Sequence, residues 1–350
     1  MKQRCVHWQS LRDLCQALLE AEKMPEADAF ICADNLVDAD LSGVESHGVS
    51  RLGNYLKRLK TQVVACENRV RVVEEHAASL AIDGGNSMGM VVGTTSMHKC
   101  IEKARVSGSC FATAMNSNHY GMASYYVAMA AEAGMIGITG SNAPPNLAPW
   151  GSPQKYMGTN PIAFSAPTGG RPIILDMAPS VVAMGKIILA AKLGKSIPDG
   201  WVLDPDGKPT TDPVVGQHGT LVPIGGPKGS GLAIFGEILS GVLSGSNWGP
   251  HINHFWNDFE NPQNVGHYFL AIDINKFIPY ASFLDRITQM VDELKALPKS
   301  PGTKEIYLPG EIELLTKEKR KAHGIELPLS VYLELTELAE RYQIAFEIDR

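Results

Sequence analysis

A histidine, an arginine and a tyrosine follow one another at intervals of four residues: His47, Arg51 and Tyr55. If the segment is helical, that step keeps the three side chains in one polar stripe beside an apolar one. An imidazole moves protons near neutral pH, a guanidinium holds a carboxylate through two parallel hydrogen bonds, and a phenol donates a third. The stripe predicts a site for a small organic acid, although the wet face of an ordinary helix carries the same residue types.

A second histidine lies where a predicted strand gives way to a predicted helix. His119 stands in the segment Asn116–Gly121, and such junctions form the edge at which α/β sheets usually place ligands. The alternative is a turn histidine that is bonded to its own backbone. Two loop histidines, one with an arginine and a tyrosine beside it, favour a site that holds an acid or base.

A glycine-rich segment, 225–231, precedes a predicted helix and contains Lys228. Glycines let backbone N–H groups approach a phosphate, and a helix N-terminus and a lysine favour an anion. The segment is not a P-loop, since Gly229 follows the lysine, and no GxGxxG opens a βαβ unit. A dinucleotide would therefore bind without the usual fingerprint; the alternative is a turn that caps a core helix.

Two other motifs were weighed for chemistry. Gly85-Asn86-Ser87-Met88-Gly89 matches GxSxG and makes Ser87 a candidate nucleophile of a hydrolase, but no HGGG-type loop precedes it and a glycine-rich turn explains it. His251 and His254 form the only tight histidine pair, without a cysteine or an acidic residue at zinc spacing. We expect no metal.

Composition excludes several classes of protein. The 350 residues are enough for about two domains, with 44% hydrophobic and 19% charged residues and a net charge of -6. The chain has no block of basic residues, which argues against nucleic acid or an anionic membrane as its main partner. Six scattered cysteines without a CxxC pair, and no signal peptide or apolar membrane span, favour a cytoplasmic protein with reduced thiols.

Hydrophobic periodicity divides the chain into a helical N-terminal unit, residues 1–60, and a mixed α/β core. Ser10 and Asp13 resemble a capping box at the start of the first helix. Helices are predicted over 10–24, 25–41, from 47 onward, 91–106, 122–133, after 231, 281–297 and 329–342. Strands are predicted over 69–74, 79–83, 109–115, 135–140, 161–167 and 172–177.

Ordered motifs along most of the chain resemble the malate/L-lactate dehydrogenase type 2 family, which also contains ureidoglycolate, L-sulfolactate and 2,3-diketo-L-gulonate oxidoreductases. These motifs are Ala39-Asp40, Ser46-His47-Gly48 with Arg51, Asn118-His119-Tyr120-Gly121, Ala148-Pro149-Trp150-Gly151, Gly158-Thr159-Asn160-Pro161, Leu175-Asp176-Met177-Ala178, Ser196-Ile197-Pro198, Thr210-Thr211-Asp212-Pro213, Gly226-Pro227-Lys228-Gly229 and Pro309-Gly310-Glu311.

The resemblance implies an NAD- or NADP-dependent 2-hydroxy acid oxidoreductase with a non-Rossmann cofactor core and a mixed sheet. It also implies a homodimer in which both subunits shape the site. It makes His119 the proton donor and acceptor, with His47 as the alternative, and Ser46, Arg51 and Tyr55 the substrate contacts. The cofactor contacts it implies are Asn142, Thr159, Asn160, Asp176, Met177, Ala178, Lys228, Gly302, Thr303 and Lys304.

The same resemblance predicts a helical domain of residues 1–68 with 310–350, and a cofactor and substrate domain of residues 69–309. A malate- or L-lactate-like acid is the expected substrate. Ala143-Pro144 replaces the polar pair of ureidoglycolate enzymes, which argues against ureidoglycolate; Ser230 replaces a common aromatic, and Gln62 a usual glycine. A hydrolase using Ser87 and a non-catalytic NAD(P)-binding regulator are the rivals from other classes.

Overall fold

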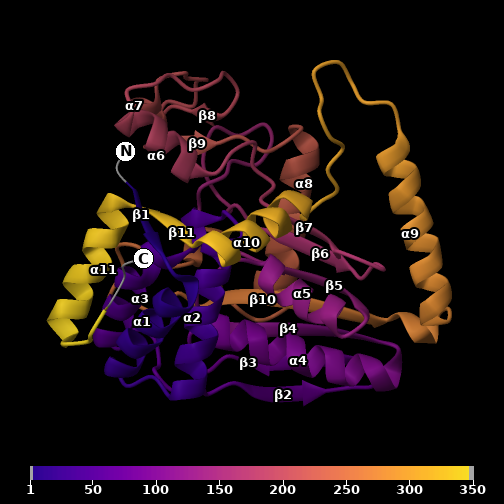
Figure 1. Cartoon of the computed structure of the whole chain (residues 1–350). Helices are drawn as coiled ribbons and strands as arrows, with labels where there is room; N and C mark the ends of the chain where they lie inside the picture. Colours follow the sequence, from indigo (N-terminus) through magenta and orange to yellow (C-terminus); the bar gives the residue numbers. More distant parts are fainter. Residues whose placement is uncertain (1–2, 347–350) are drawn as a thin grey trace.

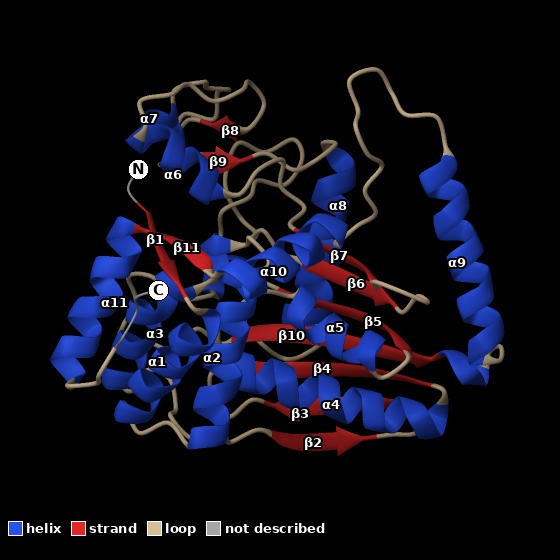
Figure 2. Ribbon diagram, viewed as in Figure 1, coloured by secondary structure: helices blue, strands red, loops and turns tan. Residues whose placement is uncertain are grey.

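A seven-stranded mixed sheet forms the centre of the molecule (Figures 1 and 2). The computed structural model describes residues 3–346. The strand order is β2-β3-β4-β10-β5-β6-β7, in which β3 and β4 run parallel and every other neighbouring pair is antiparallel. The strands are β2 (Arg71–Glu75), β3 (Ser79–Asp83), β4 (Ser109–Ser117), β5 (Met135–Ser141), β6 (Ile162–Ala166), β7 (Ile173–Met177) and β10 (Val265–Asp273). The predicted mixed α/β class is confirmed, with all six predicted strands in it.

The central strand of the sheet, β10, is missing from the sequence-based prediction. It pairs antiparallel with β4 on one side and β5 on the other, so seven of its nine residues are buried. The apolar run Tyr268–Ile272 is the pattern of a strand buried on both faces, which lacks the polar alternation that marks a half-exposed strand. That uninterrupted run was the available signal.

Helices cover both faces of the sheet. Successive residues of a strand point to opposite faces, and on β10 the ring of Phe269 packs against Tyr126 of α5 while Tyr268 packs against Phe235 of α8. α4 (Gly89–Ser107) lies beside α5 (Ser124–Glu132), and α8 (Pro227–Glu237) continues as a π-helical segment, Ile238–Val242. The core between the sheet and α4 and α5 is rich in small side chains, among them Ala112, Ala114 and Ala130.

The N-terminal helices share a second core with the C-terminal end of the chain. This core joins α1 (Trp8–Ala21), α2 (Glu26–Leu41), α3 (Leu52–Lys60) and α11 (Leu329–Tyr342), and β1 (Gln3–Val6) pairs antiparallel with β11 (Ile325–Pro328). On α10 (Glu311–His323), Lys317 forms an ion pair with Asp38 of α2. The domain limits at residues 68 and 310 stay a prediction.

Two local predictions in the N-terminal unit are wrong. α1 begins at Trp8 after His7, and no side chain caps it, so Ser10 and Asp13 lie inside the helix and form no capping box. The segment that starts at His47 is not one helix either. It forms two short 3₁₀ turns, Glu45–His47 and Val49–Arg51, before α3 begins at Leu52.

The segment between β7 and α8 packs with the β5–β6 connection in a small hydrophobic cluster, which includes Ile187 and Leu221 from the former and Leu147 from the latter. Its elements are short: α6 (Met184–Lys192), β8 (Val202–Leu203), α7 (Pro213–Gly216) and β9 (Thr220–Leu221). α9 (Tyr280–Ala296) stands at the right of Figure 1 and buries only Ile287 in the described chain. Among the residues described, no helix is long and apolar enough to span a membrane.

Replacing Phe269 by alanine tests the importance of the central strand. The side chain is fully buried between β10 and α5, so its loss should lower the free energy of unfolding by about 3–5 kcal/mol. Urea unfolding followed by circular dichroism measures this. Phe277→Ala is the matched control, because that ring is 70% exposed, and it should change stability by less than about 0.5 kcal/mol. Equal losses in both variants would contradict the assignment of the core.

Candidate active site

His119 lies in the loop between β4 and α5, as the sequence predicts. The loop is fixed by a hydrogen bond in which the backbone N–H of His119 donates to the side-chain carbonyl of Gln263 at 3.0 Å. Gly121 follows with a φ of +78°, a conformation that glycine adopts without strain. The side-chain amide of Asn118 donates to the backbone of Asn86 and Ser87, which ties the loop to the start of α4.

Arg51 and Tyr55 reach His119 from the other side of the site. Tyr55 Oη lies 2.5 Å from Nδ1 of His119, and Arg51 Nη1 lies 3.4 Å from Nε2. The ring of His47 stacks on that of His119, with 5.7 Å between centroids. The Ser46 hydroxyl lies 3.0 Å from Nδ1 of His47, and the Ser46 carbonyl accepts a hydrogen bond from Arg51 Nε. All five predicted catalytic and substrate residues therefore meet in one place.

The hydrogen bonds indicate which ring nitrogen of His119 is free to act. A guanidinium only donates, so a hydrogen bond from Arg51 requires a lone pair on Nε2 and the ring proton on Nδ1. In that tautomer Tyr55 Oη accepts a hydrogen bond from Nδ1–H. The backbone N–H of Gly121 points at Nδ1 from 3.3 Å and favours the opposite tautomer. We assign the tautomer from the contact with the charged donor, which leaves the lone pair of Nε2 directed at the Arg51 guanidinium.

The three histidines around this site, His47, His119 and His267, are kept neutral. Burial, followed by repulsion from the Arg51 cation, lowers the pKa of His119 well below its usual value and lowers the pKa of His47 to about 3. Burial also lowers the pKa of Arg51 itself. In the described chain no carboxylate pairs with Arg51 or hydrogen-bonds to His119. The site is thus an uncompensated cation beside a neutral base.

A buried carboxyl group shapes the turn that carries Arg51. Asp40 Oδ2 accepts from the backbone N–H of Val49 at 2.7 Å, and a side chain at Gly48 would lie 2.1 Å from the Asp40 carboxyl. Burial raises the pKa of Asp40 to about 7. Asp40 therefore supports the Ser46-His47-Gly48 turn and does not contact the reacting groups.

An aromatic loop completes this side of the site, and the sequence-based prediction missed it. Residues 252–263, here called the aromatic loop, place the Phe255 ring 5.0 Å from the rings of both His119 and Tyr55. The guanidinium of Arg51 lies 5.1 Å from the centre of the Trp256 ring. Three aromatic residues in His254–Phe259, in a chain with 7% aromatic residues, were the available signal.

The predicted cofactor residue Asp176 is linked to the His119 loop. It lies at the end of β7, and Asp176 Oδ2 accepts from the backbone N–H of Ser124 at 2.8 Å, at the start of α5. Desolvation by the surrounding protein raises the pKa of the Asp176 carboxyl, although the residue as a whole is exposed to solvent. Met177 and Ala178 follow it, both partly exposed. An accepting oxygen is left on Asp176 for a hydroxyl of a ligand.

Two of the predicted cofactor residues have their side chains fully occupied. Asn142 accepts from the N–H of Gly266 and donates to the carbonyl of Asn247. Asn160 donates to Glu237 at 2.6 Å and accepts from the N–H of Ala143, and Thr159 beside it is partly exposed. Asn142 and Asn160 are buried, so any cofactor contact would come from their backbone.

The predicted helix after residue 231 begins earlier, because α8 starts at Pro227 and the glycine-rich segment forms its N-cap and first turn. This turn leaves the Lys228 side chain without a partner among the described residues, whereas its backbone amides are occupied. The N–H groups of Gly229 and Ser230 donate to the carbonyls of Ile224 and Gly226, so the first turn offers little open backbone to a phosphate. The Lys228 side chain is exposed and forms no ion pair within the described chain. Gly302, Thr303 and Lys304 form an exposed loop after α9. The free Lys228 ammonium suits a phosphate.

Ser87 has a structural position in the fold. Its hydroxyl accepts from the N–H of Arg69 at 2.9 Å and donates to the carbonyl of Glu67, and the residue is 1% exposed. A nucleophilic serine needs an imidazole at this hydroxyl and access to a substrate. The arrangement does not support the hydrolase alternative.

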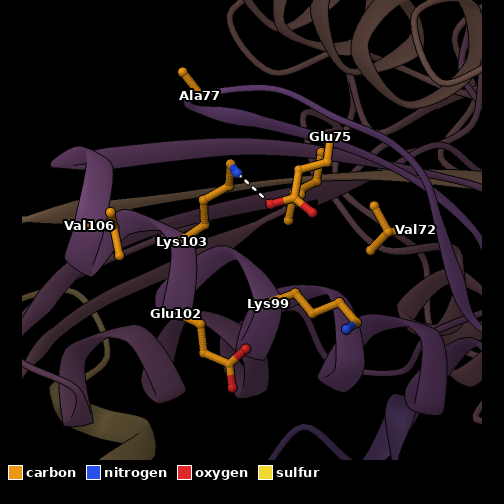
Figure 3. A pocket seen from close by; sticks show the side chains of 8 residues that line it. Val72, Glu75, Ala77, Lys99, Glu102, Lys103 and Val106 are labelled. Carbon is orange, nitrogen blue, oxygen red and sulfur yellow. Dashed lines mark hydrogen bonds and ion pairs between the residues drawn. The ribbon is translucent and has the colours of Figure 1, made fainter.

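Two cavities of the described surface lie away from these residues. One lies between β2, β3 and α4, where Lys103 forms an ion pair with Glu75 above Val72 (Figure 3). The other lies between the β6–β7 turn and α9, and contains Arg171 and Lys295. None of their lining residues is a predicted site residue. Within residues 3–346 no group of histidine, cysteine and acidic side chains could hold a metal ion.

Comparison with known proteins identifies the fold and its chemistry. The family model described as malate/L-lactate dehydrogenase matches residues 6–336. A malate dehydrogenase from Pyrococcus horikoshii is 44% identical over 91% of this chain and 90% of its own length. A ureidoglycolate dehydrogenase (NAD(+)) from Escherichia coli is 35% identical over 91% of this chain and 90% of its own. The structure of a sulfolactate dehydrogenase from Methanocaldococcus jannaschii superposes with a TM-score of 0.93 at 37% identity, over 98% of each chain.

The mixed sheet has a neutral histidine in the loop after β4, and an arginine from the turn before α3 reaches that histidine. Together with these matches, this site defines a dehydrogenase of hydroxy acids. The chain belongs to the malate/L-lactate dehydrogenase family, as its motifs indicate. It is an NAD(P)-dependent oxidoreductase that acts on the CH–OH group of 2-hydroxy acids.

Acid should destabilise the protein through its buried neutral histidines. Burial lowers the pKa of His267 to about 3, so the unfolded chain binds more protons, and stability is lost as the pH falls below about 6.5. His267→Gln should lose less stability than the native protein between pH 7.5 and 4.5, measured by urea unfolding. The exposed-site control His76→Gln should follow the native curve. Parallel curves for all three proteins would contradict this account.

Proposed function

We propose that this chain interconverts a small 2-hydroxy acid and its 2-oxo acid, with Arg51 holding the substrate carboxylate and His119 moving the proton. The observation that carries the proposal is the unpaired Arg51 guanidinium 3.4 Å from His119 Nε2. In a 2-hydroxy acid the carboxylate and the reacting carbon are neighbours. One group that binds the anion and one that takes the hydroxyl proton must therefore lie side by side.

Substrate binding would itself adjust the base. With the site empty, Arg51 repels a proton from His119, so Nε2 keeps its lone pair and can accept the hydroxyl proton during oxidation. A bound carboxylate neutralises Arg51 and makes an imidazolium less costly. In this tautomer Tyr55 Oη accepts a hydrogen bond from Nδ1–H and holds the ring in this orientation, as the orienting member of a catalytic group does. His47 stacks on His119 and would orient the substrate.

A nicotinamide cofactor, when bound, would provide the hydride acceptor or donor for this reaction. The residues that would hold it are Lys228 toward a phosphate, Asp176 toward a hydroxyl, and the backbone around Asn142, Thr159 and Asn160. Met177, Ala178 and the loop Gly302–Lys304 are further candidates by resemblance to the family. The exposed Lys228 cation and the accepting oxygen of Asp176 fit a dinucleotide, and these residue types give no preference between NAD and NADP.

We infer a malate- or L-lactate-like acid as the substrate. A relative named malate dehydrogenase shares 44% of its aligned residues with this chain, and relatives named L-sulfolactate dehydrogenase share up to 39%. The polar pair of ureidoglycolate enzymes is replaced by Ala143-Pro144, which argues against that acid. One pocket side chain changes such a preference at a cost of about 1–3 kcal/mol.

We further infer a homodimer. α8 and the π-helical segment present Leu232, Phe235 and Val242 outward, and these side chains are 41%, 48% and 59% exposed. The apolar stripe that the sequence shows after Gly231 is thus largely exposed, although the Phe235 ring also contacts Tyr268 of β10. Isolated chains rarely expose a continuous apolar face, so a second copy of this chain is its expected cover.

A cytoplasmic location is proposed from the thiols. All six cysteines are free, and four of them are buried. A compartment that keeps thiols reduced suits that pattern.

Enzymatic turnover tests the proposed function. Oxidation of NADH and NADPH should be screened with pyruvate, oxaloacetate, 2-oxoglutarate, sulfopyruvate, 2,3-diketogulonate and oxalurate. At least one acid should be reduced, and His119→Ala should lower kcat about 10²–10⁴-fold, because proton transfer is lost, with cofactor affinity retained. His47→Ala should mainly raise the KM of the acid. Full kcat in His119→Ala would transfer the catalytic role to His47, and cofactor binding with no turnover would indicate a regulator.

Charge on the apolar face tests the homodimer. Phe235→Glu should convert the protein from dimer to monomer in analytical ultracentrifugation and should lower turnover, because a carboxylate cannot be buried there without a partner. Val106→Glu places the same charge at a side chain that is 84% exposed on α4, and it should leave both properties unchanged. A native protein that sediments as a monomer would refute the dimer.

A further inference from the structure

Arg58 is a fully buried cation that has no role in the chemistry described so far. Its side chain is 0% exposed, and it lies on α3 one turn after Tyr55. Nη1 donates to the carbonyls of Phe255 at 3.2 Å and Asp258 at 2.7 Å. Burying a cation is costly, so the hydrogen bonds from Arg58 to two carbonyls of one loop indicate that Arg58 holds that loop in place.

α3 holds the aromatic loop through one helical face. Asn54, Lys57 and Arg58 are spaced i, i+3 and i+4 along α3, which places them together. Asn54 Nδ2 donates to the carbonyl of Phe255 at 2.9 Å, and Lys57 Nζ lies 3.7 Å from the centre of the Phe259 ring. The loop is thus fixed at Phe255, Asp258 and Phe259, on both sides of Trp256.

The aromatic loop in turn holds Arg51. The guanidinium lies over the Trp256 ring at 5.1 Å and within 5.8 Å of the centre of the Phe255 ring, and its Nε donates to Ser46. These contacts fix the arginine without a carboxylate, which would compete with an anionic substrate. Phe255 is 4% exposed and belongs to the core, whereas Trp256 is 53% exposed and borders the open side of Arg51.

We propose that Arg58 and Trp256 are positioning residues for the substrate-binding Arg51: Arg58 fixes the aromatic loop on α3, and Trp256 fixes the orientation of the guanidinium. The inference rests on the proposed function, since it assigns the carboxylate to Arg51. It adds a second arginine whose effect on substrate affinity passes through the loop. Neither residue touches the reacting atoms.

Steady-state kinetics of matched variants test the proposal. In Trp256→Ala and Arg58→Met, the KM of the best 2-oxo acid should rise about tenfold to a hundredfold, because the fork is no longer held in its productive geometry. Saturating kcat and the dissociation constant of NADH should stay within about threefold. Trp256→Phe and Arg58→Lys should restore most of the affinity, since phenylalanine keeps an aromatic face and an ammonium can donate to both carbonyls.

Trp8→Ala is the control, because Trp8 packs against Arg12 at 5.3 Å on α1 and should leave every constant unchanged. Hydrogen exchange of the peptide 252–263 gives a readout without turnover: Arg58→Met should exchange faster there than the native protein. An acid KM within twofold of native in both Trp256→Ala and Arg58→Met would overturn the proposal, as would native exchange in Arg58→Met. A native protein that reduces no acid, with the exchange difference present, would instead refute the proposed function.

Discussion

The contact between an unpaired guanidinium and a neutral imidazole is the interaction on which the rest of the site depends. A carboxylate beside Arg51 would stabilise it, but it would also occupy the position of an anionic substrate and favour a protonated His119. The fold holds Arg51 by other means: a backbone carbonyl at Ser46 and two aromatic rings. The cost of an uncompensated cation remains until an anion binds, and affinity for small acids follows from it.

The sheet supports this arrangement through bonds between strands of distant sequence. His267 on β10 lies 2.8 Å from the Ser117 hydroxyl at the end of β4 and 3.0 Å from the Ser141 hydroxyl at the end of β5. The Tyr120 ring stacks on His267, with 4.4 Å between centroids. The loop of His119 and the strand that leads to Asn142 are therefore fixed to one buried imidazole. In its neutral form this imidazole donates from one ring nitrogen to one hydroxyl and accepts at the other from the second.

Most of the helices and strands and most of the site residues are predictable from the sequence, but the tertiary contacts between them are not. His119 was placed correctly, because a strand-to-helix junction is a local pattern. The spacing of His47, Arg51 and Tyr55 predicts one helix, whereas the structure has two 3₁₀ turns before α3, and the second is bonded at Val49 to the buried Asp40 carboxyl. β10 was missed because a strand buried on both faces shows no alternation. Phe255 and Trp256 were missed because they contact Arg51 and His119 only through the tertiary fold.

The space at Gly48 limits how this site can change. A Cβ at that position would fall within 2.3 Å of three atoms of the Asp40 carboxyl, so the glycine and the aspartate, which lies in the last turn of α2, form one packed unit. Exchange of either alone removes support from the turn of Arg51. Combinatorial libraries that seek new substrate ranges should therefore keep Asp40 and Gly48 as a fixed pair. They can place diversity at the solvent-accessible positions around them, where variants keep the scaffold intact.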